Sequence, residues 1–453
     1  MRFTLAFTLL SLLSAQTTTP PVPQLSPQAA YAEAVRPVEI THRSIENWSN
    51  IETAALAVAV KQAQTACAAR PPEQLAGEDL IALARLCVLG QQWPAVLSAA
   101  EAYLRPALPS APPPQQITLA LAYRIEASLQ LKDPVTALSA AQTLLRAQPY
   151  TALSQQITEE LLHYLQLIQT ADSIALATER QPLILTQLRS PAPAASAPNN
   201  QAAVTPHELY DAALMLPTLQ QLSNKPADAA SSLEQLEAAL PSALSPDETI
   251  FIARARRQYA LLGKPLPSLP ASVSLFGINE TPRINTRYGS ATVLLLFPNW
   301  CAQCVRMGQQ FMPTLVRHAG EDLHLYGLLA QLKPPPSTPT PPPTPSPTPS
   351  QTSRRARSPS SSAPHPADSV DPAQPKSAAD LLRGTPTLVV ANDLTETVFA
   401  AADFPMLIVT DHAGIIRFLQ VAPDNAFVPG GLVDQLASHV AKLWPPPGIP
   451  ATP

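Results

Sequence analysis

The sequence is poor in glycine, in charge and in aromatic side chains. It has 13 glycines in 453 residues, 14% charged residues and 5% aromatic residues, whereas average usage is roughly 7% glycine and 25% charged residues. Proline is in excess instead, with 54 residues. One compact domain with evenly spread proline is therefore not the expected architecture, and the length predicts about three domains of roughly 150 residues each.

Other absences narrow the function classes. A formal net charge of −4 leaves no basic surplus, so the composition favours neither nucleic acid nor an anionic membrane surface as a partner. The glycine-poor N-terminal half offers no phosphate-binding loop, no Gly-x-Ser-x-Gly motif occurs, and the eight histidines form no ligand pair. No cofactor is predicted.

The N-terminus has the pattern of a targeting segment. Residues 3–13 are an apolar run, preceded by Arg2 and followed by Ser14 and Ala15. This pattern is typical of a cleaved secretory signal peptide, here residues 1–15. An uncleaved anchor is the alternative, but the run is too short for a bilayer core that needs about 20 residues. We therefore predict an extracytoplasmic protein, periplasmic or secreted, with no membrane span after cleavage.

Export affects how the four cysteines are interpreted, because disulfides persist outside the cytosol. They fall into two close pairs, Cys67 with Cys87 and Cys301 with Cys304. A bridge between Cys67 and Cys87 would join two neighbouring helices if their Cα atoms lie within about 7 Å. Two buried thiols that pack as small apolar residues are the alternative.

Composition divides the chain into segments. Residues 16–44 are a Pro/Thr/Ala-rich linker, which we expect to bury no core. Residues 45–264 are rich in Ala, Leu and Gln, with Gly77 and Gly90 as the main interruptions, which predicts an all-α region. Within this region, segments of similar design occur at 89–104, 131–149 and, more weakly, 222–241.

These segments have a helix end, a polar turn and a second helix with small residues at its packing face. The spacing from Val96 to Ala137 recurs from Ala100 to Ala141. The design resembles the tetratricopeptide repeat, whose small-residue and terminal-proline positions match Ala137, Ala141, Leu144 and Pro149. A generic array of helical hairpins is the alternative. Both architectures stack helix pairs around a concave face, and the resemblance implies a protein or peptide partner on that face.

The pattern changes at residue 265. Residues 265–445 hold nine of the 13 glycines and several β-type apolar runs. We predict strands over 293–297, 323–329, 387–390, 406–409 and 415–419, and helices over 305–317, 394–402 and 432–443. The last two strands flank a turn at residues 411–414 and form a hairpin.

The first of these strands leads into a Trp-Cys-x-x-Cys sequence, residues 300–304, and then into a helix. With Pro405 directly before a later strand and the hairpin, this order resembles the thioredoxin-like superfamily, in its extracytoplasmic TlpA branch or the related peroxiredoxin-like branch. The resemblance implies an α/β thioredoxin-like domain, protein thiols or disulfides as substrates, Trp300 covering the cysteines, and Pro405 as a cis-proline facing them. A cis-proline leaves the neighbouring backbone free to pair with an extended substrate.

The spacing of Cys301 and Cys304 indicates the chemistry. Cysteines three apart on a helix lie one turn apart, so they can close a disulfide with little backbone movement. Cys301 falls in the first turn, where the helix dipole favours a thiolate, and is the candidate nucleophile. Cys304 is the candidate resolving thiol. The alternatives are a structural disulfide and a zinc half-site, which would need two further ligands that no motif provides.

Departures from the family leave the activity open. Leu295 stands where many thioredoxins carry a buried acid, the dipeptide between the cysteines is Ala302-Gln303, and Phe404 before the proline is bulky. Pro298 stands where a peroxiredoxin would carry threonine, so peroxidase activity is the minor interpretation. The sequence therefore predicts a thiol-disulfide oxidoreductase with a helical-repeat scaffold. A repeat-based binding protein with a redox-inactive thioredoxin-like domain is the alternative.

Residues 331–376 interrupt the thioredoxin-like pattern. They include ten prolines between residues 334 and 350, which predicts a disordered insertion with polyproline character. A tether or docking segment is one interpretation, and a tolerated surface insertion is the other, because loop length adds little closure cost. Residues 446–453 form a short tail.

Overall fold

The computed structural model describes most of the helical region and the larger part of the sheet region. The described residues are 25–41, 50–105, 113–190, 204–267, 291–298, 301, 304, 307, 310, 313, 314, 316–318, 323–330, 387–390, 398–401, 404–422 and 426–443. The predicted signal peptide, the insertion at 331–376, the tail at 446–453 and Trp300 lie outside them.

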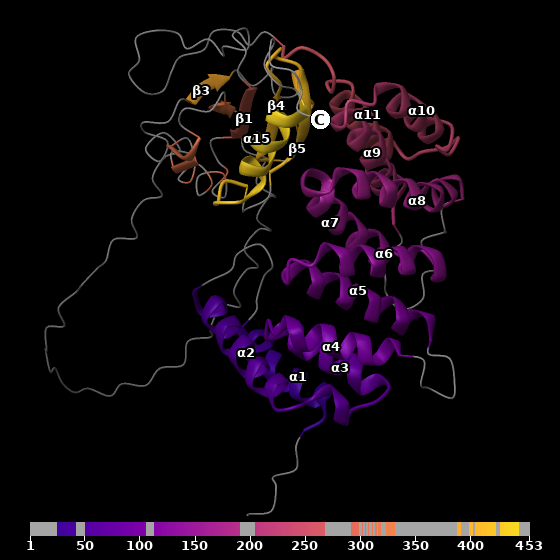
Figure 1. The fold of residues 1–453 in the computed structure, drawn as a ribbon, viewed down its shortest axis with the longest axis vertical. Coiled ribbons are helices and arrows are strands. Elements are labelled where there is room, and N and C mark those ends of the chain that lie inside the picture. The colour runs from indigo at the N-terminus through magenta and orange to yellow at the C-terminus, as the bar shows by residue number, and fades with distance from the viewer. Residues whose placement is uncertain are drawn as a thin grey trace, which may run out of the picture. The chain divides into compact units, whose positions relative to one another are not determined.

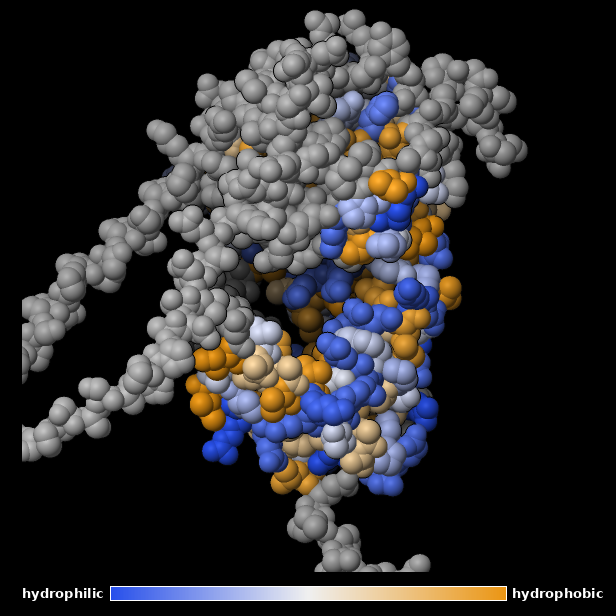
Figure 2. Space-filling view, turned by 90° about the vertical axis from the view of Figure 1, so that its left-hand side faces the viewer, coloured by the Kyte–Doolittle hydropathy of each residue, from blue (hydrophilic) through white to orange (hydrophobic). Residues whose placement is uncertain are grey.

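The N-terminal region is all-α, as the sequence predicts (Figure 1). Its elements are α1 (Pro27–Thr41), α2 (Asn50–Ala68), a 3-10 turn (Pro72–Gln74), α3 (Glu78–Leu89), α4 (Trp93–Leu104), α5 (Pro114–Gln130), α6 (Pro134–Ala147), α7 (Ala152–Ile168), α8 (Thr170–Arg189), α9 (Pro206–Leu222), α10 (Pro226–Glu237) and α11 (Pro246–Tyr259). On the face drawn in Figure 2, hydrophobic and hydrophilic side chains of the described helices are interspersed.

The expectation that residues 16–44 bury no core is wrong for α1. Ala30 and Ala34 are buried in one hydrophobic cluster with Ala63 of α2 and Leu83 of α3. Proline content averaged over the whole segment concealed this helix, because most of these prolines precede it and Pro27 occupies its first position, where the missing N–H costs nothing. Alanine then allows the close approach of the neighbouring helices.

Three helix pairs share one turn geometry. In each turn a backbone N–H returns to the carbonyl five residues earlier, and the donor and acceptor residues are Gln92 and Cys87 (2.9 Å), Asp133 and Ser128 (2.8 Å), and Lys225 and Gln220 (2.8 Å). The residue before each donor is left-handed, with φ of 55° at Gln91, 59° at Lys132 and 57° at Asn224. This is a Schellman-type helix ending. The three predicted segments therefore share the geometry of their turns.

The chain divides into two compact units, residues 1–161 and residues 162–453. The second unit contains α8 to α11 and the whole sheet region. The last helices of the all-α region thus belong to the same unit as the sheet, and the sequence pattern does not indicate this.

The described strands form one five-stranded sheet in the order β3-β2-β1-β4-β5. They are β1 (Ala291–Pro298), β2 (Leu323–Ala330), β3 (Thr387–Val390), β4 (Met406–Thr410) and β5 (Ile416–Val421), and α15 (Leu432–Leu443) follows. β1 pairs in parallel with β2, and β2 pairs in parallel with β3, whereas β4 is antiparallel to both β1 and β5. Every residue of β1 is buried, as expected of a central strand read from a continuous apolar run.

Alternate residues of β1 face two separate hydrophobic clusters. Val293, Leu295 and Phe297 contribute to the cluster that contains Cys301 and Cys304, which we call the cysteine cluster. Its other buried members include Leu222, Met307, Leu407, Val409, Phe418, Phe427 and Leu436. The opposite side of β1 contributes to a second cluster, the rear cluster, with Leu262, Leu294, Leu296, Phe399, Met406, Ile408 and Ile416.

The segment that follows α11 joins the sheet directly. The Gly263 N–H donates to the Ile416 carbonyl at 2.8 Å, and the Ile416 N–H donates to the Lys264 carbonyl at 2.8 Å. The Leu266 N–H donates to the Gly414 carbonyl at 2.8 Å. The helical region therefore continues into an extra edge segment beside the start of β5.

Candidate functional site

Cys301 and Cys304 form a disulfide directly after β1. Their Cα atoms are 5.2 Å apart. The Cys301 N–H donates to the carbonyl of Pro298, the last residue of β1, at 3.3 Å. The Cys304 N–H donates to Cys301 Sγ at 3.2 Å, and Cys304 is helical. The segment after β1 thus places the Cys301 sulfur where the backbone N–H of the helical residue Cys304 points at it.

The two sulfurs differ in access. Cys301 is 8% exposed and Cys304 is fully buried, and both belong to the cysteine cluster. An incoming group can therefore reach Cys301 first, whereas Cys304 can be attacked only after the surrounding apolar side chains move. The assignment of Cys301 as nucleophile and Cys304 as resolving thiol stays a prediction.

The surroundings of the disulfide are apolar. Leu295 is 1% exposed and packs in the cysteine cluster. Position 295 therefore provides no acid that could accept a proton from a reduced Cys304 thiol.

Pro405 directly precedes β4, the strand that pairs antiparallel with β1. The Phe404–Pro405 peptide bond is cis, and the Pro405 carbonyl accepts the Ala422 N–H at 2.8 Å. Phe404 is partly buried and packs against both the cysteine cluster and the rear cluster. The predicted role of Pro405 in facing a substrate stays a prediction, as does that of Trp300.

The helical region contacts the segment that leads to Pro405. Gln258 of α11 donates its Nε2–H to the Ala400 carbonyl at 3.0 Å, and Ala400 has a left-handed φ of 49°. Phe399 beside it is fully buried in the rear cluster. Sequence reasoning missed Gln258, because a single glutamine near a helix end carries no signal of a partner so far along the chain.

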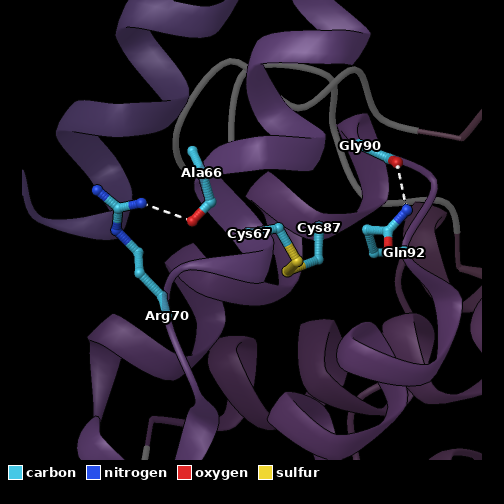
Figure 3. The surroundings of a disulfide bond; sticks show 6 residues. All are labelled: Ala66, Cys67, Arg70, Cys87, Gly90 and Gln92. Carbon is cyan, nitrogen blue, oxygen red and sulfur yellow. Dashed lines mark hydrogen bonds between the residues drawn. A yellow bond between two sulfur atoms is a disulfide. The ribbon is translucent and has the colours of Figure 1, made fainter.

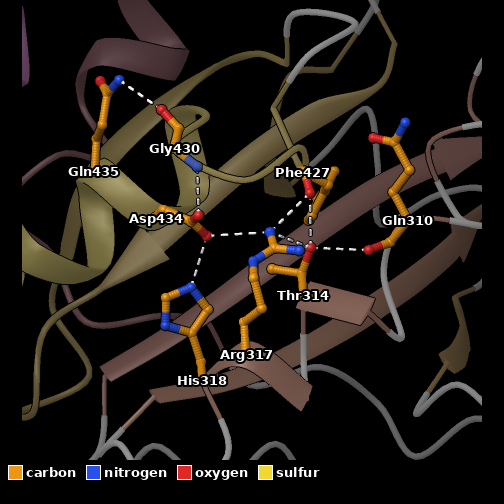
Figure 4. A network of polar contacts seen from close by, with 8 residues as sticks. All are labelled: Gln310, Thr314, Arg317, His318, Phe427, Gly430, Asp434 and Gln435. Carbon is orange, nitrogen blue, oxygen red and sulfur yellow. Dashed lines mark hydrogen bonds and ion pairs between the residues drawn. The ribbon is translucent and has the colours of Figure 1, made fainter.

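A polar network joins Thr314, Arg317 and His318 to the start of α15 (Figure 4). Asp434, in the first turn of α15, accepts hydrogen bonds from His318 Nε2 at 2.8 Å, from Arg317 Nη2 at 3.2 Å and from the Gly430 N–H at 2.7 Å. Arg317 Nη2 and Thr314 Oγ1 each donate to the Phe427 carbonyl at 2.9 Å.

This network reaches the disulfide through packing. The Phe427 side chain is buried in the cysteine cluster, so its backbone is held by the network while its ring contacts the core around Cys301 and Cys304. No motif in the sequence marks these residues. An acidic residue in a first turn, such as Asp434, was the available signal.

Asp434 ties the stability of the sheet region to pH. Burial opposes ionisation of its carboxyl group, but hydrogen bonds from His318, Gly430 and Arg317 outweigh burial and hold its pKa below the usual value. A lowered pKa stabilises the fold above the unfolded-state pKa of about 3.9, and this contribution is lost as the pH falls through the folded-state pKa.

We therefore expect Asp434→Asn to lower the free energy of unfolding at pH 7 by about 2 kcal/mol, because charge-assisted hydrogen bonds are lost. Urea unfolding followed between pH 7 and pH 3 should fall less steeply for this variant than for the wild type. Glu234→Gln, which removes the same charge from an exposed site on α10, is the control and should change neither value. Equal pH slopes for wild type and Asp434→Asn would contradict the prediction.

The second disulfide joins α2 to α3 (Figure 3). The Cα atoms of Cys67 and Cys87 are 5.2 Å apart, and both side chains are buried. Gly90, at the end of α3, lies against the α2 backbone, where an added Cβ would be 2.7 Å from the Gln64 nitrogen. The two helices are thus in close contact beside the bridge, and this disulfide belongs to the helix core.

Neither a metal centre nor a membrane-spanning helix is found among the described residues. No group of three His, Cys, Asp or Glu side chains is placed to hold a metal ion there. No helix in the same residues is long and apolar enough to cross a membrane.

The fold and the site together define an all-α region followed by a mixed α/β sheet that carries a Cys-x-x-Cys disulfide. Comparison with known proteins finds no matching family model, no matching curated protein and no matching solved structure.

Proposed function

We propose that the protein is an exported thiol-disulfide oxidoreductase of thioredoxin-like type, with Cys301 and Cys304 as its redox pair and the helical region as the scaffold that holds its protein substrate. The observation that carries the proposal is the position of the disulfide, at the end of a buried central strand with Cys301 8% exposed and Cys304 fully buried. The predicted signal peptide supports export.

The chemistry proceeds by two exchanges. In the reducing direction, the Cys301 thiolate attacks one sulfur of a substrate disulfide, forms a mixed disulfide and releases the other substrate sulfur as a thiolate, which takes up a proton. The Cys304 thiolate then attacks Cys301 Sγ, forms the internal disulfide and releases the second substrate thiolate. Two electrons pass from the protein to the substrate. The same steps in reverse oxidise a substrate dithiol.

The apolar surroundings affect the second exchange most. Cys304 must lose its proton to attack, and Leu295, which is buried in the same cluster, cannot accept it. The second exchange is therefore expected to be the slow step, so a mixed disulfide on Cys301 should accumulate more than in a protein with an acid at the position of Leu295.

A binding protein with a permanently oxidised disulfide is the second candidate function. The burial of Cys304 and the apolar Leu295 favour it, because both disfavour the thiolate that turnover needs. Its helical region would bind a partner without any exchange of disulfides.

Trapping on Cys301 distinguishes the two candidates. The Cys304→Ser variant should retain a substrate or a small aromatic disulfide as an adduct that dithiothreitol removes, seen by mass spectrometry of the intact chain. The wild type should turn over the same disulfide. The matched control carries both Cys301→Ser and Cys304→Ser and should form no adduct. If neither an adduct nor turnover is observed, the binding protein is the correct function.

A further inference from the structure

Three charged side chains lie on alternate helices of the first unit without ion-pair partners among the described residues. They are Arg85 on α3, Glu126 on α5 and Glu160 on α7. Arg85 and Glu160 are exposed and Glu126 is partly buried. Helix α3 contacts both α1 and α5, so residues of these helices can form a continuous row.

The repeated turn places two of these residues at the same position. Cys87 and Ser128 provide the carbonyls that accept the equivalent turn hydrogen bonds. Arg85 precedes Cys87 by two residues, and Glu126 precedes Ser128 by two. A cation and an anion therefore occupy equivalent sites on neighbouring helices, without a direct ion pair between them in the described part of the chain.

Tyrosine rings lie beside these charges. The Arg85 Cζ atom is 4.1 Å from the centre of the Tyr31 ring on α1. Tyr123 lies one turn before Glu126 on α5. Burial raises the pKa of Tyr123 to about 12, with Arg85 acting in the opposite direction and Glu126 and Tyr31 adding to the increase. Tyr123 thus lies within electrostatic range of the other three residues.

The acidic end of the row is electrostatically unfavourable as it stands. Burial raises the pKa of Glu126, and the nearby charge of Glu160 raises it further. A cationic group from a ligand would relieve both effects, just as a carboxylate would complement Arg85 above its aromatic platform.

We propose that Tyr31, Arg85, Tyr123, Glu126 and Glu160, which we call the charged row, bind an extended peptide segment that carries one acidic and one basic side chain. Packed helices lie about 8–10 Å apart, and an extended chain advances about 3.3 Å per residue. The acidic and basic residues of the ligand are therefore about three positions apart. A uniformly acidic or uniformly basic partner meets a like charge at one end of the row.

This inference identifies the kind of partner that the helical region binds, and binding itself does not require redox activity. That the bound peptide belongs to a redox substrate rests on the proposed function. Binding is tested with the full chain and fluorescent decapeptides rich in proline. The probes contain Glu-Thr-Val-Lys or Lys-Thr-Val-Glu, because the direction of the peptide is free, and the controls contain Glu-Thr-Val-Glu, Lys-Thr-Val-Lys or Gln-Thr-Val-Gln. By fluorescence anisotropy, one mixed-charge probe should bind at least about tenfold more tightly than each control, and added salt should weaken it.

Charge-reversal variants test the charged row more directly. Arg85→Glu should weaken the mixed-charge probe at least about tenfold and strengthen the doubly basic peptide, and Glu126→Lys should strengthen the doubly acidic one. Lys61→Glu, at an exposed site on α2, makes the same charge change outside the row and should leave affinity unchanged. Circular dichroism confirms folding of each variant. If all peptides bind equally, or if Arg85→Glu leaves every affinity unchanged, the charged row is not the site.

The redox state separates this inference from the proposed function. A chain with Cys301→Ser and Cys304→Ser cannot exchange disulfides, but it should bind the mixed-charge probe as the wild type does. Loss of adduct formation with intact peptide binding would overturn the oxidoreductase alone. Adduct formation without selective peptide binding would overturn the charged row alone.

Discussion

A chain that begins at residue 265 is expected not to fold, whereas a chain that begins at residue 152 is expected to keep the sheet region intact. The shorter chain contains every predicted strand and both cysteines of the Cys-x-x-Cys pair, so composition alone would suggest an independent domain. Residues 162–453 form one compact unit, however, so we expect the sheet region to need the helices that precede it.

The missing residues supply part of both hydrophobic clusters. Leu262 is 7% exposed in the rear cluster, and Leu222 is 1% exposed in the cysteine cluster. Burial of a leucine side chain contributes about 1.5–3 kcal/mol, so these two alone account for about 3–6 kcal/mol. A domain is stable by only about 5–15 kcal/mol. The truncation also removes the backbone hydrogen bonds of Gly263 and Lys264 to Ile416.

Urea unfolding followed by circular dichroism tests this prediction. The chain that starts at residue 152 should unfold in a cooperative transition, and the chain that starts at residue 265 should show none. Leu262→Ala in the full chain is the milder companion variant and should lower the free energy of unfolding of the sheet region by about 2–5 kcal/mol. A cooperative transition of the shorter chain at the same urea concentration would show that the helices are dispensable.

Removal of the Cys67–Cys87 bridge should destabilise the first unit by about 3 kcal/mol. The cross-link closes a segment of 20 residues, and a loop of this length restricts the unfolded chain by about that amount. The double variant Cys67→Ala and Cys87→Ala avoids free thiols. Thermal unfolding of residues 1–161 within the full chain is the measurement.

The control for this variant is the pair Cys301→Ser and Cys304→Ser, which leaves the bridge between α2 and α3 in place. It should not change the transition of the first unit. If the alanine variant unfolds together with the wild type, or if dithiothreitol leaves the wild-type transition unchanged, the bridge does not stabilise these helices.

Elements with one dominant local signal could be predicted from the sequence. β1 is a continuous apolar run, and its complete burial follows from its central place in the sheet. The hairpin of β4 and β5 was indicated by Asp411 and Gly414, and the structure shows why. Asp411 accepts the Ala413 and Ile415 N–H groups at 2.9 and 3.0 Å, and Gly414 adopts a φ of 75°.

Features that depend on distant partners could not be predicted. Nothing in the composition of α11 indicates that Gln258 binds Ala400, and nothing near Arg317 indicates Asp434. Helix α1 failed for a different reason, since its three buried residues are two alanines and a proline that carry little hydrophobic signal. For the site, residue spacing predicted the cysteine pair, whereas the unequal burial of Cys301 and Cys304 required the structure.

The order of the cysteines along the chain has a consequence for biosynthesis. Each disulfide joins cysteines that are neighbours in this order, with separations of 20 and 3 residues. Helix pairs with local contacts form early, whereas the sheet cannot close until distant segments meet, as Gln258 and Ala400 do across 142 residues. Both bridges can therefore form while the chain is still emerging. The Cys67–Cys87 bridge can form before the later cysteines compete for it, and the Cys301–Cys304 bridge can form before the closed sheet buries it.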